Sequence, residues 1–126
     1  MRAVDTNVLL RLVVGDEPDQ TRLAEGFVSG GAWVPLVALA ETIWALGSIY
    51  DQSLSAQARA VEMLLDEQSI VIENREAVIA ALRLFRSKPS LGFSDCLILE
   101  SARKAGHVPL GTFDRRLAKV EGAQRL

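Results

Sequence analysis

Short apolar segments alternate with longer segments of helical period, and this alternation restricts the fold more than any other feature. The short segments are 2–4, 32–34, 70–72 and 108–110, each closed by a proline, a glycine or an acidic residue. Between them, apolar residues at helical spacing predict helices over 6–14, 36–50, 75–86 and 95–104, and two more beginning near Pro18 and Ser55. Alternating strands and helices pair in parallel through right-handed crossovers. We therefore expect a three-layer α/β fold, with a fifth strand in the tail.

Length, cysteine content and charge restrict the class of protein. The 126 residues fit a single domain spanning 1–126, and the lone Cys96 excludes an internal disulfide. Charged and polar residues from Asp5 to Arg11 interrupt any signal-peptide core, so a cytoplasmic location is expected. The net charge of −2 argues against a protein that coats nucleic acid, but not against an enzyme that cuts it.

The segment 32–50 has one charged residue, Glu41, and nearly the length of a membrane span. Pro35 and Gly47 interrupt it, and a carboxylate at the bilayer centre costs about 3 kcal/mol on insertion scales. A short strand followed by a buried helix is predicted instead, with no membrane contact. A buried Glu41 needs a cation, which is either a distant arginine or a metal ion.

Three aspartates stand at the starts of predicted helices, where each also has a structural explanation. Asp5 and Asp114 each follow a predicted strand and can cap the next helix. Asp95 follows Ser94, itself a candidate cap, and its charge favours the helix dipole. Strand ends meet at one edge of a parallel sheet, so these acids can converge with Glu41.

Four converging carboxylates repel one another unless they hold a hard cation. Mg²⁺ or Mn²⁺ prefers such oxygen ligands, lowers the pKa of a bound water and stabilises the charge that develops on a phosphodiester. The four acids therefore predict hydrolysis of a phosphodiester by a metal-activated water.

These residues resemble the PIN-domain family, specifically its VapC-type toxins of type II toxin–antitoxin systems. The matching motifs are VDTNVLLR at 4–11 with GD at 15–16, AE at 40–41, FSD at 93–95 and GTFD at 111–114. The resemblance covers essentially the whole chain. It implies a five-stranded parallel sheet flanked by helices and Mg²⁺- or Mn²⁺-dependent endoribonuclease activity.

The resemblance also assigns roles to residues. It implies that Asp5, Glu41, Asp95 and Asp114 hold the metal directly or through water. Supporting positions beside these acids are Thr6, Asn7, Ser94 and Thr112. A homodimer and a cognate antitoxin, whose tail covers the acidic pocket, are also implied. Some relatives carry a further acid after the last aspartate, where this chain has Arg115 and Arg116. This departure puts a second tightly held metal in doubt and leaves the choice between one and two metals open.

The remaining polar residues have weaker functional signals. Arg115 and Arg116 are the best candidates for contacts with RNA phosphates, in a rim that could include Arg11, Arg103, Lys104 and Lys119. His107 is expected in a solvated loop, and Cys96 is expected to be buried and inert. Trp44 and Tyr50 are expected in the core or in a dimer contact rather than as base-stacking residues.

Three other functions stay open at this point. A DNase of the same fold would use the same acids. An aspartate-based phosphotransfer domain is disfavoured, because it needs a second acid after the first strand or a lysine near a later strand end. A catalytically silent binding module would have no reason to keep all four acids.

Overall fold

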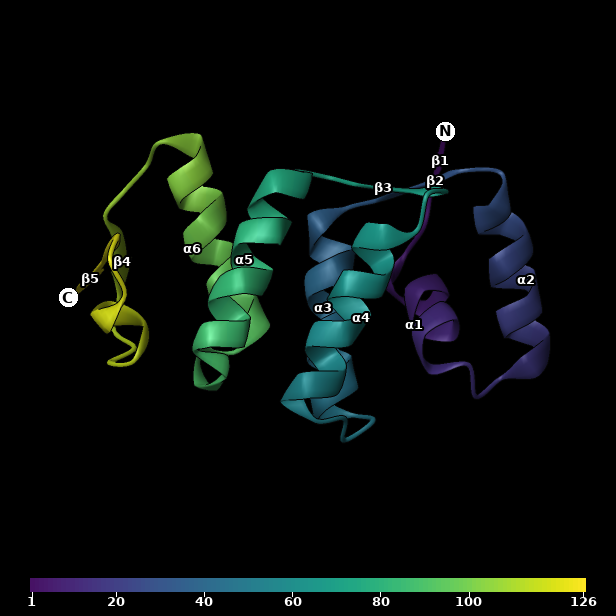
Figure 1. Ribbon diagram of the computed structural model, residues 1–126, viewed down its shortest axis with the longest axis horizontal. Coiled ribbons are helices and arrows are strands. Elements are labelled where there is room, and N and C mark those ends of the chain that lie inside the picture. The colour runs from purple at the N-terminus through teal and green to yellow at the C-terminus, as the bar shows by residue number, and fades with distance from the viewer. The chain divides into compact units, whose positions relative to one another are not determined.

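A computed structural model describes residues 1–126, which divide into two compact units, Met1–Arg75 and Glu76–Leu126 (Figure 1). The first unit runs from purple to teal in the figure and the second from green to yellow. The first unit consists of β1 (Arg2–Ala3), α1 (Thr6–Val14), α2 (Pro18–Ser29), β2 (Ala32–Val34), α3 (Leu36–Ser48), α4 (Leu54–Asp66) and β3 (Ile70–Ile72).

The three strands of the first unit form a parallel sheet in the order β1-β2-β3. Arg2 lies opposite Ala32, and Trp33 lies opposite Val71. Pairs of helices connect successive strands, as the alternating sequence pattern predicts. α1 packs against both α2 and α3, and α3 packs against α4. The largest fully buried side chains in this unit are Leu9, Val34, Leu39, Thr42, Ile43, Leu46, Val61 and Leu64.

Local signals set most helix ends in the first unit. Asp5 caps α1, and Gly15 ends it in the left-handed conformation with φ 69°. Pro18 begins α2, where its fixed φ suits the first helical turn. The predicted Ser55 cap is wrong, because Ser53 accepts the hydrogen bond from the Ala56 amide, at 3.1 Å.

The second unit has its own pair of parallel strands. It contains α5 (Arg75–Ser87, whose first residue belongs to the first unit), η1 (Pro89–Leu91), α6 (Phe93–Ala105), β4 (Leu110–Thr112), η2 (Leu117–Lys119) and β5 (Ala123–Arg125). β4 pairs with β5 in parallel, with Leu110 opposite Ala123. Phe85 of α5 and Phe93 of α6 pack edge to face, with ring centroids 5.9 Å apart.

The α/β class is confirmed, with five parallel strands flanked by six helices. Hydrogen bonds link the strands in sets of three and two. The expected strand 108–110 begins two residues later, and the short helix after Asp114 is a 3₁₀ turn. No helix in the structure is long and apolar enough to cross a membrane.

Candidate active site

Asp5 lies at the end of β1 and has a structural task. Its carboxylate accepts a hydrogen bond from the Val8 amide, at 3.1 Å, and thereby caps α1. The side chain is nonetheless exposed. A carboxylate has two oxygens and about four acceptor positions, so one capping bond leaves capacity for a cation. The capping explanation is therefore correct, and it does not conflict with metal binding.

Glu41 lies on the solvent-exposed face of α3, so the prediction that it is buried is wrong. Leu39, Ile43 and Leu46 are fully buried, whereas Val37, Glu41 and Trp44 are exposed. These three exposed residues recur at the spacing of one helical face. Sequence analysis missed this face because Val37 and Trp44 are apolar, which made α3 look apolar all round. The Glu41 carboxylate accepts one hydrogen bond, from Thr6 Oγ1 at 3.3 Å, and pairs with no arginine.

Asp5 and Glu41 line one open pocket together with Thr6 and Asn7. The wall is completed by Val4, Pro35, Val37 and Ala38. The pocket forms because β1 and β2 are neighbours, so the helices that follow them, α1 and α3, start side by side. Glu73 helps to place α3, since its carboxylate accepts a hydrogen bond from the Leu36 amide at 2.8 Å. Sequence analysis missed Glu73, because its partner lies 37 residues away.

Asp114 follows β4 and organises the turn that leads into η2. Its carboxylate accepts hydrogen bonds from the Arg116 and Leu117 amides, at 2.8 and 2.9 Å, and its own amide donates to Thr112 Oγ1 at 3.0 Å. Hydrogen bonds to a carboxylate favour the charged form. The amide of Leu117, with that of Arg116 and the nearby Arg116 charge, lowers the pKa of Asp114.

Asp95 lies in the first turn of α6, where its environment opposes ionisation. Burial raises its pKa, and the negative charge of Asp114 raises it further. The expected cap at Ser94 is wrong: α6 begins two residues earlier than predicted, at Phe93, after Gly92 with φ 82°, and no side chain caps it. The structure thus brings Asp95 and Asp114 close enough to interact, with opposite pKa shifts.

Each unit brings together two of the candidate acids. No group of three or more His, Cys, Asp or Glu side chains that could hold a metal ion is found in the structure. Mg²⁺ is usually held by one or two carboxylates, keeping several waters and taking further oxygens from a phosphate. The Asp5–Glu41 pocket and the Asp95–Asp114 pair both fit this donor set. A cation beside Asp95 would also offset its repulsion from Asp114.

Asp95→Asn is expected to stabilise the metal-free protein at neutral pH. Since the folded-state pKa of Asp95 is raised, ionising it costs more in the folded than in the unfolded chain, and the wild type loses stability as pH rises above about 4. The advantage of the variant should therefore grow with pH and level off above the raised pKa. Urea denaturation in a chelator from pH 4 to 8 measures it. An advantage that is independent of pH would contradict this interpretation.

Several of the predicted phosphate-binding cations have structural partners instead. Arg103 pairs with Glu100 at 2.8 Å and donates to the Glu121 carbonyl at 2.7 Å, which ties α6 to the turn before β5. Arg11 pairs with Asp16 at 3.1 Å, and Lys104 pairs with Glu76. The exposed ones without such partners are Arg115, Arg116 and Lys119.

Three other expectations concern single residues. Cys96 is fully buried, as expected, and burial raises the pKa of its thiol to about 12, which disfavours the reactive thiolate. His107 is exposed, as expected. Trp44 is not a core residue, because 63% of its surface is exposed.

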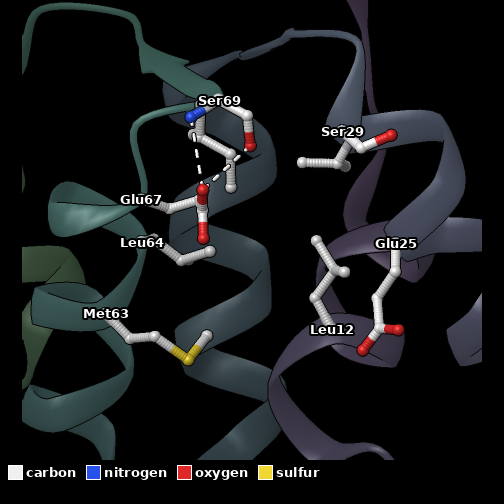
Figure 2. Close-up of a pocket in the computed structure, with 9 residues that line it drawn as sticks. Leu12, Glu25, Ser29, Met63, Leu64, Glu67 and Ser69 are labelled. Carbon is white, nitrogen blue, oxygen red and sulfur yellow. Dashed lines mark hydrogen bonds between the residues drawn. The ribbon is translucent and has the colours of Figure 1, made fainter.

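A second hollow in the first unit lies apart from the acids (Figure 2). Apolar side chains of α1, α2 and α4 line it, among them Leu12, Met63 and Leu64, with Glu25 and Glu67 at its sides. Glu67 is already engaged, since its carboxylate accepts hydrogen bonds from the Ser69 amide and hydroxyl, at 3.3 and 3.0 Å. The hollow contains no candidate site residue.

Comparison with known proteins gives a match to the family model described as PIN domain, over residues 2–123. The match includes both units and all four candidate acids. Neither the curated proteins nor the solved structures yield a match.

Proposed function

Because the chain belongs to the PIN-domain family, whose members are generally metal-dependent nucleases, we propose that it is a Mg²⁺- or Mn²⁺-dependent endoribonuclease. The observation that carries the proposal is the Asp5–Glu41 pocket, in which two carboxylates from distant parts of the chain meet in the open. The Asp95–Asp114 pair supplies the remaining acids.

The acids and the two threonines have different roles in the proposed site. Asp5, Glu41, Asp95 and Asp114 hold the metal, which when bound polarises the phosphodiester and lowers the pKa of the attacking water. The Thr6 hydroxyl donates to the Glu41 carboxylate and positions it, and the Thr112 hydroxyl accepts a hydrogen bond from the Asp114 amide and so positions Asp114.

Neighbouring polar and basic residues complete the proposed site. Asn7 lies in the wall of the acid pocket, and Ser94 is the immediate neighbour of Asp95. Both are assigned supporting roles. Arg115 and Arg116 are exposed beside Asp114 and are assigned to RNA phosphates, because guanidinium groups match phosphate geometry.

The biological role follows from the sequence resemblance to VapC-type toxins. We propose that the protein is the cytoplasmic toxin of a type II toxin–antitoxin pair. Each chain would form a single domain over residues 1–126, and two chains would form a homodimer. The proposed antitoxin covers the acids and prevents cleavage. A gene for a small DNA-binding protein directly upstream would support this role, and light scattering would test the dimer.

Two measurements test the proposal: the dependence of RNA cleavage on metal, and the stabilisation of the folded protein by metal. Mn²⁺ at 100 times its Kd is expected to stabilise the folded protein by about 2.7 kcal/mol, since binding contributes RT ln(1 + [L]/Kd). Thermal denaturation measures this stabilisation. RNA cleavage in Mg²⁺ or Mn²⁺, and its loss in a chelator, measures the activity. No stabilisation over a wide range of metal concentration would favour a binding module without turnover.

Matched substrates and a chemical probe separate the enzymatic alternatives. DNA of the same sequence, cleaved as fast as the RNA, would favour a DNase. A phosphoryl-fluoride mimic that forms an adduct at Asp5 would favour an aspartate-based phosphotransfer domain.

A further inference from the structure

The exposed face of α3 carries an indole one helical turn beyond Glu41. Val37, Glu41, Trp44 and Ser48 are all exposed, and their spacing of four, three and four residues places them on one face. Residues three apart on a helix have Cβ atoms about 5–6 Å apart. Trp44 is not in the wall of the Asp5–Glu41 pocket, but it lies one helical turn from Glu41, which is in that wall together with Val37 from the same face.

We propose that Trp44 stacks on an unpaired base next to the bond that is cut, and thereby selects single-stranded RNA. This inference rests on the proposed function. Single-stranded RNA can present its bases to aromatic side chains, whereas the bases of a duplex are already stacked and paired. An indole with 63% of its surface exposed has a free face to offer such a base.

The polar residues of this face favour RNA over a second copy of the chain. Glu41 lies between Val37 and Trp44, so a second copy of the chain that covered both apolar residues would also bury this carboxylate. The Glu41 carboxylate has only the Thr6 hydroxyl as its partner, and burying an unpaired carboxylate is costly. RNA with a bound divalent cation gives Glu41 an opposite charge and gives Trp44 an aromatic partner.

Two substitutions of Trp44 separate stacking from apolar packing. Trp44→Leu keeps an apolar side chain without an aromatic face, and Trp44→Phe keeps an aromatic face. Trp44→Leu is expected to raise KM for single-stranded RNA about 5- to 100-fold, as loss of one stacked base does, with little change in kcat. Trp44→Phe should remain close to the wild type. An unchanged KM in Trp44→Leu would overturn the proposal.

Substrates with one abasic nucleotide identify the partner of Trp44. The wild type should show one position near the cut where loss of the base raises KM, and Trp44→Leu should be insensitive at that position, which is the signature of a direct interaction. Equal effects of Trp44→Leu on intact and abasic substrates would overturn the proposal. So would a change in oligomeric state, measured by light scattering, without any dependence on the base.

Fluorescence gives a readout that does not depend on cleavage. The chain has two tryptophans, and Trp33→Phe on β2 leaves Trp44 as the sole indole. With Ca²⁺ in place of Mg²⁺, single-stranded RNA should quench Trp44 and a duplex should not. Absence of quenching would overturn stacking. A wild type that binds and quenches with RNA but never cleaves it would contradict the proposed function alone.

Discussion

Asp5→Asn and Asp114→Asn are each expected to lower metal-dependent RNA cleavage by at least about 100-fold. The free energy of unfolding should hardly change in Asp5→Asn, and should fall modestly at neutral pH in Asp114→Asn, because the fold favours the charged form of Asp114. Both carboxylates accept hydrogen bonds from backbone amides. Asp5 accepts one from Val8, and Asp114 accepts one each from Arg116 and Leu117. An amide oxygen can accept the same hydrogen bonds, and Asn and Asp are comparable helix caps. Both variants lose the negative charge that the metal requires, and a 100-fold loss of activity corresponds to about 2.7 kcal/mol.

Cleavage rates and urea denaturation of the same preparations measure the two effects. Asp5→Ala is the informative comparison, because it removes the cap as well and should cost about 1 kcal/mol of stability. Asp19→Asn is the matched control, since Asp19 is an exposed acid that pairs with Arg22 on α2 and should leave cleavage unchanged. Wild-type activity in Asp5→Asn would mean that Asp5 is a cap and nothing more.

Leu39→Ala is expected to destabilise the protein by about 2–5 kcal/mol, whereas Val37→Ala should change stability by less than about 0.5 kcal/mol. The two residues are neighbours on α3 with similar chemistry but opposite burial. Leu39 is fully buried, so its truncation leaves a cavity, whereas 69% of the surface of Val37 is exposed. Urea denaturation of both variants compares the two faces directly.

Equal losses in the two variants would contradict the assignment of an exposed face to α3, and with it the exposed position of Glu41. A loss in Val37→Ala that appears only in the presence of RNA or metal would instead point to its place in the wall of the acid pocket. The first outcome is read from urea denaturation of the free protein, and the second from the same measurement repeated with RNA or metal.

Elements whose signals lie within a few residues could be predicted from the sequence. α1 has the predicted bounds, because its cap and its terminal glycine directly flank the helix. The strands β2 and β3 have the predicted bounds for the same reason, since turn residues or an acid close each one. Which serine caps α4 could not be predicted from the sequence. Ser53 and Ser55 are both suited to begin α4, and Ser55 accepts a hydrogen bond from Arg59 instead.

Burial could not be read from residue type alone. α3 is rich in apolar side chains on all sides, and only the packing of α1 and α4 against it decides which of them are covered. Glu41 is exposed, so burial does not oblige it to pair with a cation. Its place beside Asp5 supports metal binding for a different reason: two carboxylates line the same open pocket and can share a cation.

The sequence by itself determined the α/β class, most element boundaries and the identity of the candidate acids, because helix period, caps and turn residues act over short distances along the chain. Tertiary structure decided which distant residues meet. Thr6 reaches Glu41 across 35 residues, and Glu73 holds the start of α3 across 37. Such contacts leave no local pattern, since they depend on the order in which parallel strands pair.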